Sequence, residues 1–140
     1  MRDIVNKLIK VKKTISTMES CTGGAVANAI TNIEGASAVL KFSAVTYSNE
    51  YKIKMGVNKE TIEKYTVYSI EVAKEMSKAI STFTASDYGI GVTGQINRTD
   101  PNNVKDDCNL IYISIYDKQN DNYYTDNLMA LPISRAKNKE

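Results

Sequence analysis

The chain has 140 residues, of which 42% are hydrophobic and 24% are charged, and its formal net charge is +2. This length and composition are typical of a single globular domain. The interspersed charges form no basic stripe for nucleic acid, and no apolar run reaches the length of a membrane span.

The chain contains no histidine and two cysteines, Cys21 and Cys108. The lack of histidine excludes a Ser-His-Asp triad and argues against a transition-metal site. Acid–base chemistry must therefore use Lys, Asp, Glu, Tyr or Cys. The two cysteines are far apart in the sequence and lack metal-ligand spacing, and the N-terminus shows no signal-peptide pattern. Together these features predict a cytoplasmic protein with reduced thiols.

Hydrophobic spacing predicts helices alternating with strands from the start of the chain. Apolar residues at helical spacing predict a helix over 3–10. β-Branched residues predict a strand over 14–18, and a helix is expected from residue 23 to about residue 32. A second strand is predicted over 39–47.

Capping residues indicate three further helices. Asn49 can cap a helix through residue 55, Asn58 a short one through residue 64, and Ser69 the longest of the three. The longest helix carries an apolar stripe that we expect to be core: Val72, Met76, Ile80 and Phe83.

The last third of the chain is predicted to be mainly strand. Residues 88–94 should form a strand that leads into a polar, turn-rich loop over 95–108. Strands over 110–116 and 123–131, joined by a turn, should pair as a hairpin.

Alternating strands and helices imply βαβ units around a parallel core, and the C-terminal hairpin makes the sheet mixed. We therefore expect an α/β fold, a three-layer α/β/α sandwich with a mixed, mostly parallel sheet of about five strands. Open α/β sheets bind ligands at the carboxyl ends of their strands. Ser20, Tyr47 and Thr93 should meet at that edge.

The segment Met-Glu-Ser-Cys-Thr-Gly-Gly at 18–24 connects the first strand to the next helix. It places the hydroxyl of Ser20 at a helix N-terminus, and its glycines let the backbone approach a ligand. This geometry suits a bound phosphate or the oxyanion of acyl transfer, and both uses remain open. The simpler interpretation is that Ser20 or Thr22 only caps the helix.

The segment 18–24, with Val-Thr-Tyr-Ser-Asn-Glu-Tyr-Lys at 45–52, resembles the CinA C-terminal domain family. Segments 55–57, 67–76 and 91–94 extend the likeness in register. Stand-alone members of that family are nicotinamide-nucleotide amidases with a three-layer α/β/α fold. The resemblance implies a metal-independent hydrolase without a cofactor, which converts nicotinamide mononucleotide to nicotinic acid mononucleotide and ammonia.

The resemblance also assigns roles to residues. The family's serine falls on Ser20, its lysine on Lys52 and its associated tyrosine on Tyr47. We expect substrate contacts from the segment after the first strand, the end of strand 88–94 and the C-terminal segment: Thr22, Gly23, Gly24, Thr93 and Arg135.

The chemistry of these residue types is consistent with such roles. A serine hydroxyl is a weak nucleophile until a base takes its proton. Burial and a neighbouring positive helix end would lower the pKa of Lys52 and make it a suitable base. Tyr47 would orient Lys52 or relay a proton to the leaving amide. Cys21 is the rival nucleophile, ranked below Ser20 because only the helix end would depress the pKa of its thiol.

The sequence departs from the family pattern in two places. The family's glycine-rich loop is replaced at 95–103, where Arg98 is a candidate phosphate contact. This change leaves a weak or inactive nucleotide-binding module as the alternative function, and a subunit that acts only with a partner domain as a third. The chain also stops five residues after Arg135, without the family's last helix, so we expect an uncovered sheet face and a homodimer.

Overall fold

The computed structural model describes residues 1–97 and 109–140. The expectations for Arg98 and for most of the loop at 95–108 lie outside these residues. In chain order the elements are α1 (Arg2–Lys10), β1 (Ile15–Glu19), α2 (Ala25–Thr31), η1 (Ala36–Ala38), β2 (Leu40–Val45), α3 (Asn49–Lys54), α4 (Lys59–Tyr65), α5 (Ile70–Thr84), β3 (Tyr88–Gly94), β4 (Leu110–Asp117), β5 (Asn122–Met129) and η2 (Lys137–Lys139). The expected helices and strands are present, and only the short 3₁₀ helices η1 and η2 were not predicted.

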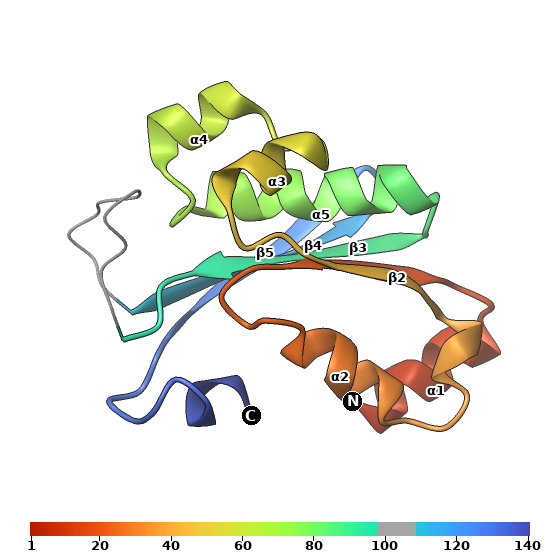
Figure 1. Ribbon diagram of the computed structural model, residues 1–140. Coiled ribbons are helices and arrows are strands. Elements are labelled where there is room, and N and C mark those ends of the chain that lie inside the picture. Colours follow the sequence, from red (N-terminus) through yellow and green to blue (C-terminus); the bar gives the residue numbers. More distant parts are fainter. Residues whose placement is uncertain (98–108) are drawn as a thin grey trace.

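The strands form one mixed sheet in the order β2-β1-β3-β4-β5. β1 pairs in parallel with both β2 and β3, whereas the pairs β3–β4 and β4–β5 are antiparallel. Helices α3, α4 and α5 cover one face, and α1 and α2 cover the other (Figure 1). The expected three-layer α/β/α architecture with a mixed sheet is confirmed, with as many antiparallel as parallel strand pairs.

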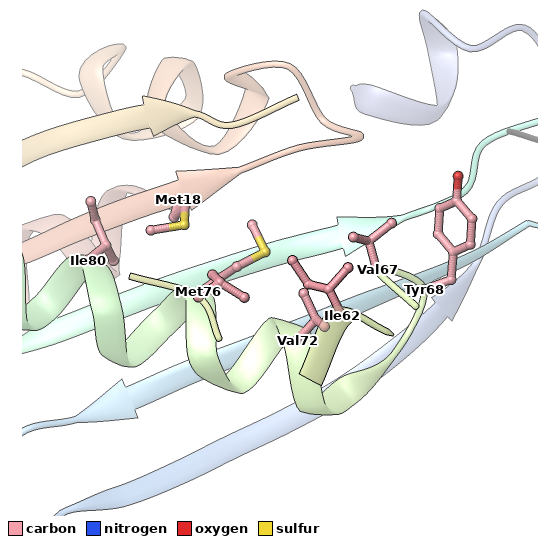
Figure 2. Packing of buried hydrophobic residues seen from close by; sticks show 8 residues of the cluster. Met18, Ile62, Val67, Tyr68, Val72, Met76 and Ile80 are labelled. Atoms are coloured by element: carbon pink, nitrogen blue, oxygen red, sulfur yellow. The ribbon is translucent and has the colours of Figure 1, made fainter. Parts of the chain in front are cut away.

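A core cluster joins α5 to the sheet, and Figure 2 shows its side chains gathered between this helix and the strands. Met18 of β1 and Val72, Met76 and Ile80 of α5 are fully buried. A Cβ built on Gly91 of β3 would lie 2.2 Å from the carbonyl oxygen of Ala73. The helix therefore packs directly on the backbone of the strand.

The expectation that Phe83 belongs to this core is wrong, because its side chain is 65% exposed. The close approach of α5 to β3 requires small residues on the contact face, and Ser77 and Ser81 occupy it, fully buried. Phe83 lies outside that face and instead pairs with Phe42 of β2 at 5.7 Å between ring centroids.

The opposite face of the sheet carries a second cluster, which α1 and α2 complete with Val5 and Ile30. Ile15 of β1 and Val39 before β2 pack against them. Every residue of β1 is buried because helices cover both of its faces. Across the described residues, no helix combines the length and the apolar character needed to cross a lipid bilayer.

Candidate active site

The chain leaves strand β1, which lies between β2 and β3, through a tight turn over residues 20–24, here called the elbow. The N–H of Gly23 donates to the carbonyl of Ser20 at 3.0 Å. Gly23 and Gly24 have φ angles of +63° and +97°, a conformation that side-chain-bearing residues rarely adopt. The two glycines thereby turn the chain into α2 and leave Ser20 at the carboxyl end of β1.

Glu19, the last residue of β1, holds the first turn of α2. Its carboxylate is fully buried and accepts the N–H groups of Val26 at 3.0 Å and of Ala27 at 2.8 Å. A carboxylate at a helix N-terminus also interacts favourably with the helix dipole. This role was missed at the sequence level. The signal for it is an acid just before the elbow, combined with the lack of any acid in the first turn of α2.

Lys52 reaches the elbow from the short helix α3. The expectation that Asn49 caps this helix is wrong by one residue: Asn49 is its first residue, and the hydroxyl of Ser48 caps it by accepting the N–H of Tyr51. The Lys52 side chain is 1% exposed, and its Nζ lies 3.0 Å from the Oγ of Ser20. The same Nζ donates to the carbonyl of Thr46 at 2.7 Å. The structure therefore brings together the two residues expected to be nucleophile and base.

This pair has the geometry of an activated nucleophile. A side chain within hydrogen-bond distance of a serine hydroxyl can take its proton as the hydroxyl attacks. The Thr46 carbonyl holds Nζ in position beside Ser20.

Cys21 is a poor nucleophile in this environment. Its side chain is 3% exposed, and this burial raises the pKa of the thiol to about 11. A backbone hydrogen bond and the charges of Lys52, Lys139 and Arg135 act in the opposite direction but do not overcome the burial. The thiol is protonated at neutral pH, which supports the choice of Ser20 over Cys21.

Tyr47 lies at the surface of the site, and its side chain is 64% exposed. Arg135 donates to the Tyr47 hydroxyl from Nη2 at 3.1 Å and to the carbonyl of Ile96 from Nη1. The C-terminal segment, residues 131–140, is thus tied to the connection between β2 and α3 and to the chain after β3. That Tyr47 orients Lys52 or relays a proton stays a prediction.

The two threonines of the expected site differ in their surroundings. Thr93 is 1% exposed, and its hydroxyl donates to the carbonyl of Val67 at 2.7 Å, which ties β3 to the segment before α5. The Oγ1 of Thr22 is buried in the elbow without a hydrogen-bond partner in the described part of the chain. Substrate contacts by these two residues stay predictions.

Comparisons with known proteins agree on one family. The family model described as the CinA C-terminal domain matches residues 1–138. A putative competence-damage inducible protein from Clostridium botulinum is 43% identical over 114 residues, which are 81% of this chain and 28% of that protein. A CinA-like protein from Kosmotoga olearia is 42% identical over 114 residues, covering 81% of this chain and 27% of that protein.

This chain therefore spans little more than a quarter of the length of either relative. Among solved structures, the competence/damage inducible protein CihA from Agrobacterium tumefaciens superimposes with a TM-score of 0.87 at 27% identity. That superposition covers 99% of this chain and 83% of the other. A CinA superfamily protein from Escherichia coli, at 23% identity and a TM-score of 0.85, shares the fold.

Proposed function

We propose that this chain, which belongs to the CinA C-terminal domain family, is an amidohydrolase that converts nicotinamide mononucleotide to nicotinic acid mononucleotide and ammonia. The observation that carries the reaction type is the buried contact of 3.0 Å between Ser20 Oγ and Lys52 Nζ. The substrate follows from the sequence resemblance of segments 18–24 and 45–52 to stand-alone family members.

In the proposed mechanism, Ser20 Oγ attacks the carbonyl carbon of the amide while Lys52 Nζ takes the hydroxyl proton. The tetrahedral intermediate collapses as the C–N bond breaks, and Lys52 returns the proton to the departing ammonia. A water molecule then attacks the resulting ester, again with Lys52 as base, and releases the carboxylic acid and the free serine. Every proton thus passes through a single amine.

The negative oxygen of the tetrahedral intermediate needs hydrogen-bond donors. The amides of Val26 and Ala27 already bond to Glu19, and the amide of Gly23 bonds to Ser20. We therefore propose that backbone N–H groups of the elbow next to Ser20 donate hydrogen bonds to the oxyanion, rather than the N–H groups in the first turn of α2. The phosphate of the substrate then requires a separate set of donors.

The test is ammonia release from nicotinamide mononucleotide by the pure protein. Ser20→Ala should reduce kcat by about 10³-fold or more, as expected when a nucleophile is removed. Cys21→Ser is the matched control, because it alters the neighbouring residue and should retain activity within a few fold. Full activity in Ser20→Ala would overturn the mechanism.

Calorimetry distinguishes the enzyme from its alternative. If the wild-type protein binds nicotinamide mononucleotide but releases no ammonia, the chain is a nucleotide-binding module rather than an amidase. If purification from the native cell adds a partner and activity returns, the third possibility, a subunit that works only with a partner domain, is supported instead.

A homodimer in the cytoplasm is also part of the proposal. Its support is an apolar strip on β4 and β5, where the exposed side chains of Ile115, Tyr124 and Leu128 lie in neighbouring strands. Exposed apolar strips of this kind are typical of interfaces. Light scattering at several protein concentrations checks the expectation, and a monomer mass at the highest concentration would contradict it.

A further inference from the structure

We propose that Lys139 and Arg135 of the C-terminal segment, with the hydroxyl of Thr22, form a subsite for the phosphate monoester of the substrate on the Gly23 side of the elbow. This inference rests on the proposed function, which it deepens by assigning the recognition of the anionic end of the substrate. It makes the C-terminal segment part of the site.

The first observation is the position of Lys139. The 3₁₀ helix η2 lies on the same side of the sheet as α1 and α2, beyond the end of the sheet where α2 begins (Figure 1). A Cβ built on Gly23 would lie 3.3 Å from the Nζ of Lys139. The ammonium group therefore sits directly against the elbow, three residues from Ser20.

The C-terminal segment is ordered by its own hydrogen bonds. The side chain of Asn138 accepts the N–H of Leu131 at 2.8 Å and donates to the carbonyl of the same residue at 3.0 Å. The backbone N–H of Asn138 donates to Ser134, and that of Lys139 donates to Ala136, both at 3.1 Å. These contacts close the segment into a compact turn, which holds Lys139 beside the elbow.

The second observation is an imbalance of charge. In the described ranges 1–97 and 109–140, no carboxylate forms an ion pair with Lys139 or Arg135. The one acid in the elbow region, Glu19, directs both of its oxygens to the amides of α2. Neither cation is therefore neutralised by an ion pair within the described ranges. Both are close enough to the buried Cys21 to lower the pKa of its thiol, against the larger effect of burial.

The third observation is the hydroxyl of Thr22. Its Oγ1 is buried in the elbow, and none of the described residues offers it a hydrogen bond. Buried polar atoms in native proteins nearly always have a partner, so an orphan hydroxyl next to Gly23, which Lys139 approaches, is consistent with a ligand at this end of the elbow. A hydroxyl can donate to an anionic oxygen.

These groups match the chemistry of a phosphate monoester. Arginine presents a planar fork to phosphate oxygens, and lysine contributes a compact charge with three donors. Arg135 is fixed by Tyr47 and Ile96, so its guanidinium loses little freedom when the ligand binds. The subsite would let the protein distinguish a nucleotide from the nucleoside that lacks the phosphate.

The experiment compares nicotinamide mononucleotide with nicotinamide riboside, which differs only by the phosphate. Lys139→Ala should raise KM for the nucleotide by about 10–100-fold, as expected for loss of a charge-assisted hydrogen bond, and leave the riboside unchanged. Lys137→Ala is the matched control, because it removes the same charge from the same 3₁₀ helix at an exposed position. An unchanged KM for the nucleotide in Lys139→Ala would overturn the subsite.

A binding measurement separates this inference from the proposed reaction. Calorimetry with inorganic phosphate, in the Ser20→Ala background, should show binding that Lys139→Ala weakens and Lys137→Ala does not. If this pattern is found while no nucleotide releases ammonia, the subsite stands and the amidase proposal fails. If ammonia is released but phosphate binds equally to all variants, the amidase stands and the subsite fails. Thermal denaturation of each variant verifies that the fold is intact.

Discussion

The Nζ of Lys52 lies 3.0 Å from the Oγ of Ser20, although 32 residues separate them in the chain. Parallel pairing of β1 with β2 brings the two segments together, because both strands end at the same edge of the sheet. The elbow then presents the hydroxyl, and the short helix α3 returns the amine toward it. The carboxyl edge of an open α/β sheet is where such folds bind their ligands.

Lys52→Met should separate catalysis from stability. Methionine fills a similar volume without an amine, so kcat should fall by about 10³-fold or more. The free energy of unfolding should fall by no more than about 1–3 kcal/mol, because the Thr46 carbonyl loses its donor but no buried amine must be desolvated. Urea denaturation and ammonia release check the two effects. Activity lost only in proportion to the unfolded fraction would contradict a catalytic role.

Glu19→Gln should loosen the elbow. The Glu19 carboxylate accepts two hydrogen bonds from backbone N–H groups of α2, and one of them would be lost. The side-chain NH₂ of the new glutamine would face that backbone N–H group, donor against donor. We expect a loss of about 1–3 kcal/mol in the free energy of unfolding. Because Ser20 is the next residue, kcat should fall while KM changes little. Glu34→Gln, at an exposed acid, is the control for both measurements. Wild-type kcat in Glu19→Gln would argue against a positioning role.

Gly91→Ala should destabilise the protein by about 3 kcal/mol or more, because its Cβ would lie 2.2 Å from a backbone oxygen of α5, so the helix or the strand must shift to make room. Gly24→Ala is the comparison. Its nearest neighbour is at 3.7 Å, so its cost of about 1–2 kcal/mol should come from the positive φ angle alone. Urea denaturation measures both. A larger loss for Gly24→Ala would show that the helix can shift away from β3.

Stability should fall in acid partly because of Asp87. Partial burial raises the pKa of this carboxyl, but hydrogen bonds from Thr14 and Lys13, with the charge of Lys13, outweigh it and hold the pKa below its ordinary value. A carboxyl with a depressed pKa stabilises the fold above its unfolded-state pKa near 4, and this contribution is lost as the pH falls through the folded-state value.

The measurement for Asp87 is the free energy of unfolding at pH 7 and at pH 3. Asp87→Asn should be less stable than wild type at pH 7, and the difference should shrink at pH 3. Asp126→Asn, at an exposed position of β5, should show no such convergence. If the gap between wild type and Asp87→Asn is the same at both pH values, the carboxylate contributes nothing through its charge.

Local pattern was enough to predict the elements and the architecture. Alternating strand and helix signals, together with caps such as Asn58 and Ser69, have physical causes that act within a few residues. The exposure of Phe83 was not predictable in this way. Which side of α5 faces the sheet depends on how closely Gly91 lets the helix approach, and that is a long-range property.

In the sequence alone, the resemblance of its segments to the CinA C-terminal domain family was enough to pair Ser20 with Lys52, and the lack of histidine excluded a histidine-dependent mechanism. Only the tertiary structure revealed that Glu19 occupies the start of α2, that Tyr47 contacts Arg135, and that Lys139 lies against Gly23. The physical reason is that the position of a charged residue in the sequence does not indicate which group it will contact in the folded protein. Its partner is decided by which segments the folded chain brings within a few ångströms.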